Sequence, residues 1–368
     1  MKKSMATAWA AAFCFILLIL DAKTALLGAT EGVTLCLQVL IPSLFPFFIL
    51  SLLLTNAIAG QQFPLLKPLG RLCGIPTGCE SLLMVGLLGG YPVGAQSIVH
   101  CYEQGQLSGA DARRMLGFCN NAGPSFLFGM VASRFDSVGI IWALWGIHML
   151  SALLVGAILP GKSRNTGMQT PNEPLPISKA LDKSLHVMAT VCGWVILFRV
   201  MIAFFSRWFL WLVPGWAKAL LIGMTELANG CCELELVGSS GLRFVLVSCL
   251  LAFGGLCVSM QTISVTGKLG IGLYFPGKAI QTAVSLILAS LSQYFLFRGQ
   301  ERINPLPLAA IGTVVFVALL LLMKKKKKVV AFPKLMVYNH RKDNLEVTVC
   351  SFGNGSKDPA PTASTAQS

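Results

Sequence analysis

The stretch Leu87-Leu-Gly-Gly-Tyr-Pro-Val-Gly-Ala-Gln-Ser-Ile98 decides how the chain is interpreted, because it is apolar and yet poor in helix-forming residues. Three glycines and a proline fall within residues 89–94, which weakens a helix and removes one backbone donor. In a bilayer, a broken backbone persists only where protein or a water-filled cavity satisfies its free N–H and C=O groups. We therefore expect an interrupted membrane segment inside a bundle, with the amide of Gln96 available to a solute.

A weaker copy of this stretch occurs 165 residues later (252 − 87), at Ala252-Phe-Gly-Gly-Leu-Cys-Val-Ser-Met-Gln-Thr-Ile263. The alignment pairs the two adjacent glycines of each stretch and matches Gln96 with Gln261. The same offset carries the apolar segment that starts near Gly139 onto the one that starts near Asn304. Glycine-interrupted segments at corresponding places in two halves are typical of a transporter's central site. Chance similarity between Gly-rich apolar segments is the alternative.

The composition indicates a polytopic membrane protein. Of 368 residues, 55% are hydrophobic and 12% are charged, and the mean hydropathy is +0.71. A span needs ~20 apolar residues. The candidate spans are Met5–Leu20, Val33–Ile58, Leu82–Val99, Gly139–Leu159, Leu185–Phe205, Phe244–Ser259, Ala279–Phe297 and Pro305–Met323. Two shorter apolar pieces, 115–131 and 208–224, are candidates for re-entrant segments. We expect an all-α bundle of membrane helices with two internal repeats, each with a broken or re-entrant Gly/Pro-rich segment.

These features divide the chain into five parts. They are a first transmembrane span and loop at 1–32, a first repeat at 33–159, a polar linker at 160–184, a second repeat at 185–323, and a basic, partly disordered tail at 324–368. We expect the first span to be retained, and a cleaved signal peptide is the alternative. In the second span, Pro42 and Pro46 should kink the helix.

The net charge of +14 does not indicate nucleic-acid binding, because much of it lies in Lys324–Lys328 and the tail that follows. Basic residues directly after a span are typical of a cytoplasmic anchor that contacts anionic lipid. We therefore predict a multi-pass protein of the cell membrane with a cytoplasmic C-terminal tail. A forespore membrane and a homo-oligomer are open options.

The chain lacks the patterns of a metal site or a catalytic set. Its twelve cysteines are scattered without a C-x-x-C pair, and its four histidines have no Asp, Glu or Cys partner at ligand spacing. No Ser/His/Asp set or H-E-x-x-H motif occurs either. We expect no cofactor, no metal and no enzymatic activity.

Two further segments place polar groups among apolar residues. In Phe118-Cys-Asn-Asn-Ala-Gly-Pro-Ser-Phe126, paired amides next to a Gly-Pro break predict a polar lining, and a helix cap at a loop is the alternative. Ser108 and Asp111 form a capping box just before it, which predicts the start of a helix. In the segment 224–235, Glu226 and Asn229 lie about one helical turn apart and should share a face.

Glu226 either faces water or lies in a cavity where it binds a cation, exchanges a proton or repels the wrong ligand. Arg199 lies inside a predicted span, where it is either functional or extends to the interface. The candidate substrate-binding residues are Gly89, Gly90, Tyr91, Pro92, Gly94, Gln96, Asn120, Asn121, Pro124, Ser125, Glu226, Asn229, Gly230, Gly254, Gly255, Ser259 and Gln261.

The combination of motifs resembles the nucleoside-recognition, or Gate, domain family, and within it the YlbJ-type sporulation integral membrane proteins. The motifs are Gly89–Ala95, Phe118–Asn121 with Pro124, Glu226–Gly230, and Phe253–Val258 with Gln261. The resemblance implies a polytopic membrane protein of endospore-forming bacteria, with related Gate domains in concentrative nucleoside transporters and FeoB iron permeases. It also implies a part in sporulation, in which dipicolinate is moved across a forespore membrane. Nothing in these residues selects a nucleobase.

The resulting hypothesis is a transport protein for a small solute, dipicolinate- or nucleoside-like, with an anionic solute as one option. Its partners would be membrane lipid and that solute, without nucleic acid. The chain has no nucleotide-binding motif, so a gradient or downhill flow would drive transport. The alternative is a noncatalytic membrane scaffold or assembly factor for spore formation.

Overall fold

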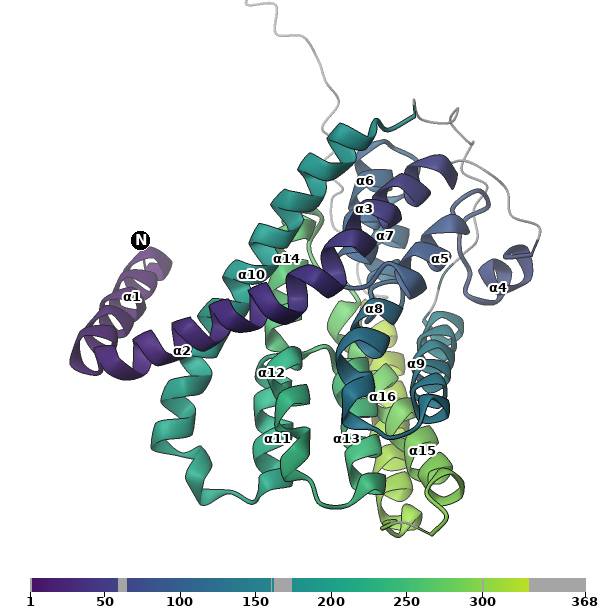
Figure 1. Cartoon of the computed structure of the whole chain (residues 1–368). Coiled ribbons are helices and arrows are strands. Elements are labelled where there is room, and N and C mark those ends of the chain that lie inside the picture. The colour runs from purple at the N-terminus through teal and green to yellow at the C-terminus, as the bar shows by residue number, and fades with distance from the viewer. Residues whose placement is uncertain (1, 59–64, 160, 162–173, 300, 331–368) are drawn as a thin grey trace, which may run out of the picture. The chain divides into compact units, whose positions relative to one another are not determined.

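The computed structural model describes residues 2–58, 65–159, 161, 174–299 and 301–330, and all regular structure in these ranges is helical (Figure 1). The α-helices are α1 Lys2–Leu20, α2 Ala22–Leu35, α3 Ile41–Ile58, α4 Lys67–Leu72, α5 Ser81–Leu88, α6 Val93–Glu103, α7 Gly109–Met115, α8 Pro124–Phe126, α9 Val138–Ile158, α10 Ile177–Trp208, α11 Gly215–Thr225, α12 Leu227–Cys232, α13 Ser240–Phe253, α14 Gly255–Thr266, α15 Tyr274–Leu296 and α16 Pro305–Val330. The wide π-helical turns are η1 Cys36–Leu40 and η2 Leu127–Val131. The 3₁₀ turns are η3 Ala132–Arg134, η4 Leu210–Leu212, η5 Glu233–Leu236 and η6 Gly267–Leu269.

The predicted all-α bundle of membrane helices is confirmed. Six helical stretches of the described chain are long and apolar enough to cross a membrane. They are Ala22–Leu54, Val138–Ile158, Ile177–Trp208, Ser240–Leu269, Tyr274–Leu296 and Pro305–Lys324. In α1, only the shorter piece Ala11–Leu20 has this apolar character. The internal repeats stay a prediction.

Residues 1–324 form one compact unit and residues 325–368 a second. The central linker at 160–184 and the disordered tail were both predicted from composition. Residues 160, 162–173 and 331–368 lie outside the described part of the chain, so both predictions stay predictions for these residues. Where the linker ends, α10 begins at Ile177, earlier than the predicted span from Leu185. The first two turns of α10, which carry Lys179, Asp182 and Lys183, are helical, although their polarity placed them in the predicted linker.

The predicted loop at 21–32 is helical in the structure. Asp21 caps α2 by accepting a hydrogen bond from the Thr24 N–H at 3.3 Å. Helix α2 then runs along α10 (Figure 1), and a Cβ added at Gly28 would lie 2.8 Å from the Cβ of Ala203. Small residues at this contact let the two backbones approach closely, which is how membrane helices associate. Local hydrophobicity does not report such a contact.

The predicted proline kink takes the form of a wide turn. Pro42 has no N–H, which leaves a carbonyl one turn earlier without its usual donor. The chain adopts the π-helical turn η1 just before this residue, and the Ile41 N–H donates to the Cys36 carbonyl. Pro46 lies inside α3. The segment from Ala22 therefore continues as one helical stretch into α3.

Both Gly-rich stretches interrupt their helices, as predicted. Helix α5 ends at Leu88, Gly90 has φ +79°, and α6 begins at Val93. In the second half, α13 ends at Phe253 and the chain passes through Gly255 with φ +83° into α14. Residues with a Cβ rarely adopt these positive φ values. The stretch 82–99 is therefore two short buried helices and not the single span that hydropathy alone suggests.

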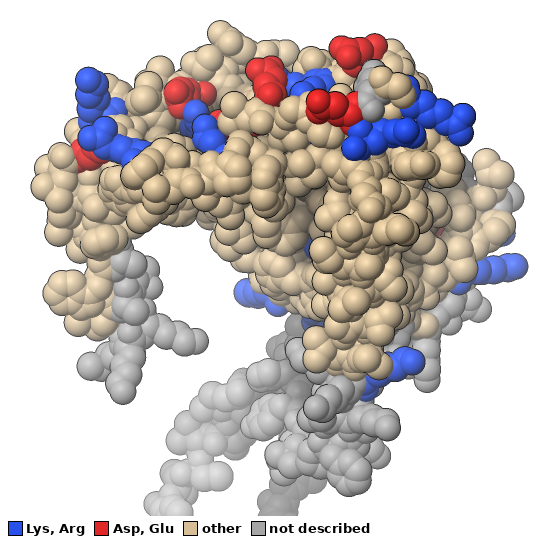
Figure 2. Space-filling model, turned by 90° about the horizontal axis from the view of Figure 1, so that it is seen from below, with Lys and Arg blue, Asp and Glu red and all other residues tan. Residues whose placement is uncertain are grey.

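The outer surface has the character expected of a protein in lipid. Many large apolar side chains of α10 and α16 are exposed, such as Leu197 and Val314. Figure 2 shows acidic and basic side chains gathered along one edge of the visible face, with most of the remaining described surface uncharged. Exposed apolar area of this extent marks a surface that another apolar phase covers. The interrupted helices lie inside this shell.

Candidate functional site

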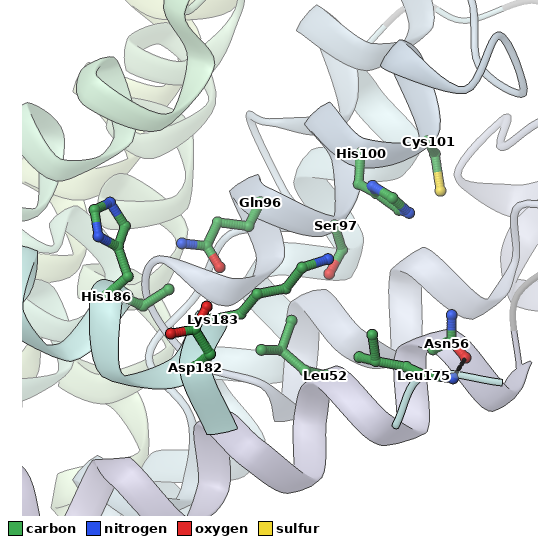
Figure 3. A pocket seen from close by; sticks show the side chains of 11 residues that line it. Leu52, Asn56, Gln96, Ser97, His100, Cys101, Leu175, Asp182, Lys183 and His186 are labelled. Atoms are coloured by element: carbon green, nitrogen blue, oxygen red, sulfur yellow. Dashed lines mark hydrogen bonds between the residues drawn. The ribbon is translucent and has the colours of Figure 1, made fainter. Parts of the chain in front are cut away.

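Three cavities lie along the two interrupted segments and share lining residues. The outer cavity has a volume of about 390 Å³ and lies between α3, α6 and the start of α10 (Figure 3). The middle cavity, of about 350 Å³, lies between α6, α10 and α14. The inner cavity, of about 50 Å³, lies where the first helix break meets α14 and the start of α12. Together they form a candidate solute pathway.

Gln96 and Gln261 join these cavities. Gln96 lines the outer and the middle cavity, and Gln261 lines the middle and the inner cavity. The structure therefore brings both glutamines of the aligned stretches to the middle cavity, which Pro92 also lines. Gln261 is 3% exposed, and its Nε2 lies 3.3 Å from the Sγ of Cys257 one turn back. Both amides can donate to or accept from a polar solute.

Glu226 lines the inner cavity. Its extended backbone separates α11 from α12, and its carboxylate caps α12. The carboxylate accepts the N–H of Ala228 at 3.1 Å, the N–H of Asn229 at 2.7 Å and the Nδ2 of Asn229 at 2.6 Å. The side chain of Glu226 is buried and lines the cavity. Of the two predicted positions, facing water or lying in a cavity, Glu226 therefore has the second. Gly230 lies directly against Gly223, which lets α12 pack on α11.

The two asparagines of the 118–126 segment do not line any of these three cavities. Both are fully buried. Asn120 accepts the Ala95 N–H at 3.3 Å and donates to the Thr262 hydroxyl at 3.0 Å. This amide therefore ties the first interrupted segment to the second. Asn120, which was predicted to line the site, therefore holds the two helices of the cavity wall together.

A buried lysine, which the sequence analysis missed, extends this network. Lys278 of α15 donates from Nζ to Gln281 Oε1 at 2.9 Å, to Asn121 Oδ1 at 3.1 Å and to the Tyr91 hydroxyl at 3.2 Å. Tyr91 in turn donates to the Leu251 carbonyl at 3.2 Å and lines the inner cavity. Lys278 precedes the predicted span 279–297 by one residue. A charged residue at the edge of an apolar segment was the available signal.

The other predicted residues have different positions. Pro124 and Ser125 line a separate, open cavity near Ser43 and Trp142. Gly90 lines the inner cavity. The remaining glycines and Ser259 shape the backbone: the Ser259 hydroxyl donates to the Gly255 carbonyl at 2.9 Å. The residues of this kind are Gly89, Gly94, Gly254 and Gly255, all buried.

Histidine and lysine side chains missed by the sequence analysis gather at the outer cavity. His100 of α6 and Lys183 and His186 of α10 all line it. His100 is more than 80 residues away from the other two, so spacing gave no signal. Within the described residues, no group of three or more His, Cys, Asp or Glu side chains is placed to hold a metal ion. Arg199 forms an ion pair with Glu31 of α2.

Interrupted helices that surround connected, partly polar cavities inside an apolar shell define a multi-pass integral membrane protein. A stretch of 171 residues is 29% identical to the sporulation integral membrane protein YlbJ of Bacillus subtilis (strain 168). The match covers 44% of this chain and 41% of that relative, so the chain matches less than half of the relative's length. No family model matches the chain. No solved structure matches it. The chain is thus related to a sporulation membrane protein, and the Gate-domain resemblance rests on its motifs.

Proposed function

We propose that this protein moves a small solute, dipicolinate- or nucleoside-like, across a membrane in connection with sporulation. One observation carries the proposal: Gln96 and Gln261, from two separately interrupted segments, line the same cavity of about 350 Å³. That cavity shares residues with one on each side. A noncatalytic helix bundle that serves as a scaffold has no need for connected cavities with facing amides.

The volumes and linings of the cavities suit a small solute that contains a single ring. Pockets for small ligands span roughly 300–1,000 Å³, and the two larger cavities lie near the lower limit. Their walls combine apolar side chains with a few hydrogen-bonding groups, which is the usual composition of a site for a small molecule. Broken helices at such a site allow one part of the bundle to move against another while the solute is held.

The charges at the two ends of the pathway differ. Lys183 and Asp182 both line the outer cavity, whereas Glu226 is the charged residue that lines the inner one. A solute with a carboxylate would be attracted at the outer end and would meet Glu226 further in. Glu226 is therefore the residue that we assign to coupling, through the binding of a proton or a cation. A gradient of that ion, or of the solute itself, would supply the energy.

The experiment is flux into vesicles that contain the purified full-length protein, measured with radiolabelled dipicolinate and with uridine. Gln96→Ala and Gln261→Ala should each lower the initial rate at least about tenfold, because each removes an amide that faces the solute. Gln104→Ala is the matched control, since Gln104 is exposed at the end of α6. Two results together would overturn the proposal and favour a scaffold. The wild-type protein would move neither solute in vesicles, and cells that carry Gln96→Ala or Gln261→Ala would sporulate normally.

A further inference from the structure

The amine of Lys278 lies in a cage of three side-chain oxygens. They are Gln281 Oε1 at 2.9 Å, Asn121 Oδ1 at 3.1 Å and the Tyr91 hydroxyl at 3.2 Å from Nζ. Lys278 is fully buried, and its Nζ also lies 5.1 Å from the centre of the Tyr91 ring. None of the ion pairs in the described part of the chain includes Lys278. Neutral oxygens and an aromatic face therefore take the place of the carboxylate that usually accompanies a buried lysine.

The hydrogen bonds around this oxygen cage orient all three oxygens towards the amine. Asn121 Nδ2 donates to two backbone carbonyls, which turns Oδ1 towards Lys278. Gln281 Nε2 donates to Asn121 Oδ1, and the Tyr91 hydroxyl donates its one proton to the Leu251 carbonyl. A neutral amine would turn its lone pair towards one of these acceptors. The oxygen cage thus fits an ammonium group, which has three N–H donors and no acceptor.

The oxygen cage lies where the two interrupted segments meet. Tyr91 belongs to the first break, between α5 and α6, and lines the inner cavity. Its hydroxyl donates to Leu251 in the last turn of α13, and a Cβ added at Gly254, in the second break, would lie 3.0 Å from the same hydroxyl. Helix α15 contributes both Lys278 and Gln281. The amine therefore connects α15 to the junction of the two breaks.

Oxygen groups at broken membrane helices are typical ligands of monovalent cations, such as the Na⁺ bound by unwound segments of transporters. A divalent ion makes a larger demand, since Ca²⁺ takes about six to eight oxygen ligands at roughly 2.3–2.6 Å. Three neutral oxygens at 2.9–3.2 Å match a singly charged group of the ammonium type. The oxygen cage has the position and the ligands of such a cation site, and the chain itself occupies it.

We propose that the oxygen cage is a monovalent-cation site that Lys278 fills with its own ammonium group. The chain thereby supplies the cation that other broken-helix junctions take from solution, and the junction is held without an ion that can dissociate. This inference goes beyond the proposed function and does not depend on the solute or on transport. It leaves Glu226 as the group assigned to coupling. Removal of the lysine side chain should create a site for an external ammonium ion.

The test uses Lys278→Ala, which removes the three methylene groups and the amine beyond Cβ. n-Propylammonium has these same atoms and can take their place. In purified full-length Lys278→Ala, n-propylammonium chloride should raise the melting temperature saturably, by at least about 2 °C, because it binds the folded state. Wild-type protein and Lys278→Met should not respond in this way, since a side chain already fills the space.

Two matched comparisons separate a cation site from a simple hole. 1-Propanol has the size of n-propylammonium without the charge, so it should not stabilise Lys278→Ala. Choline chloride at the same concentration controls for ionic strength, because choline has no N–H donor for the three oxygens. Lys268→Ala removes an exposed lysine and should behave like the wild-type protein.

Equilibrium dialysis with radiolabelled n-propylammonium measures the binding directly. Lys278→Ala should bind it at least about tenfold more tightly than wild-type protein. Equal affinity in Lys278→Ala and Lys268→Ala would overturn the inference, and so would equal stabilisation by 1-propanol and n-propylammonium. If Lys278→Ala cannot be purified, Lys278→Ser leaves nearly the same space and undergoes the same tests.

Vesicle flux of the wild-type protein is a separate readout. Absence of solute flux, together with amine binding by Lys278→Ala, would remove the proposed function and leave the cation site standing. Solute flux without amine binding by this variant would remove the cation site and leave the proposed function.

Discussion

The side chain of Asn121 uses both ends of its amide in a fully buried position. Its Nδ2 donates to the Gly86 carbonyl at 3.1 Å and to the Phe118 carbonyl at 2.7 Å. Its Oδ1 accepts from Lys278 at 3.1 Å and from Gln281 at 3.0 Å. Loss of this side chain would leave several buried donors and acceptors without the partner that they have here.

Asn121→Ala should destabilise the protein by about 3 kcal/mol or more, because it leaves several buried groups without a partner. The control is Asn304→Ala, which removes an exposed hydrogen bond that the Leu306 N–H donates to Asn304 Oδ1 and should cost only about 1 kcal/mol. Thermal unfolding in detergent measures both. Equal shifts in melting temperature would contradict the role given to Asn121.

Lys278→Met should affect transport more than stability. In this variant Asn121 Oδ1 still accepts from Gln281, and Tyr91 still donates to the Leu251 carbonyl. Its melting temperature should therefore fall less than that of Asn121→Ala. Flux of an anionic solute should fall at least about tenfold, since the variant loses the buried amine that donates to Tyr91 of the inner cavity. Full activity of Lys278→Met in the vesicle assay would show that this amine is not used.

At the scale of elements, α2 and α10 form the largest helix contact, and both small residues and an ion pair hold it. A Cβ at Gly32 would lie 3.0 Å from the Ile196 Cα. Arg199 pairs with Glu31 across the same interface. An ion pair between two membrane helices is favoured because separation would leave both charges in an apolar phase. The ion pair gives Arg199 a partner within the bundle, and the two alternatives stated for it, a functional role or extension to the interface, stay predictions.

Gly28→Ala should loosen this contact. The new methyl group would lie 2.8 Å from the Cβ of Ala203 and 2.9 Å from the Val200 Cα, so α2 has to move away from α10. A loss of about 1–3 kcal/mol is expected. Gly193→Ala on α10 is the matched control, because nothing lies within 4 Å of its added Cβ. The prediction fails if both variants melt at the same temperature.

The break between α13 and α14 depends on Gly255, whose φ is +83°. Gly255→Ala should strain the backbone by about 1–2 kcal/mol and press the new methyl group against the Gly223 carbonyl, 3.1 Å away. Gly267→Ala carries a positive φ of +46° without any contact within 4 Å. The difference between the two variants in flux and melting temperature therefore reports packing at the break. No difference would mean that the break tolerates a side chain.

At the scale of the whole molecule, the placement of basic residues predicts the orientation in the membrane. Lys162 and Arg164 follow α9, Lys179 and Lys183 open α10, and Lys324–Lys328 end the last apolar segment. Basic residues next to spans face the cytoplasm. The outer cavity, which includes Lys183, would then open to the cytoplasmic side.

A reporter fused after Ser368 should therefore lie in the cytoplasm. Green fluorescent protein at this position should fluoresce, and alkaline phosphatase should be inactive. Fusion of alkaline phosphatase after Val213, beyond the other end of α10, should be active and serves as the control. The opposite pattern at the two positions would reverse the orientation and place the outer cavity outside the cell membrane.

Much of the fold could be predicted because its signals are local. The apolar segments predict spans, the glycines and proline at 89–94 predict a break, and the capping box at Ser108 predicts the start of α7. That cap is present: Asp111 N–H donates to the Ser108 hydroxyl at 3.1 Å. The helical character of 21–32 could not be predicted, because it depends on packing against α10.

The site was predicted in part, for the same reason. Alignment of the two stretches singled out Gln96 and Gln261, which do line one cavity. The roles of Asn120 and Lys278 depend on partners more than 100 residues away in the chain, Thr262 and Asn121. Spacing within a motif does not reveal such partners. The basic outer cavity likewise exists only where α6 and α10 meet.

The sequence by itself determined that this protein is a bundle of membrane helices and where two of its helices break, since hydropathy and backbone freedom belong to each residue and its neighbours. Only the tertiary structure decided which polar side chains face a cavity and which hold its walls together. That choice depends on which distant groups satisfy a buried donor or acceptor, and chain folding alone brings those groups within hydrogen-bonding distance.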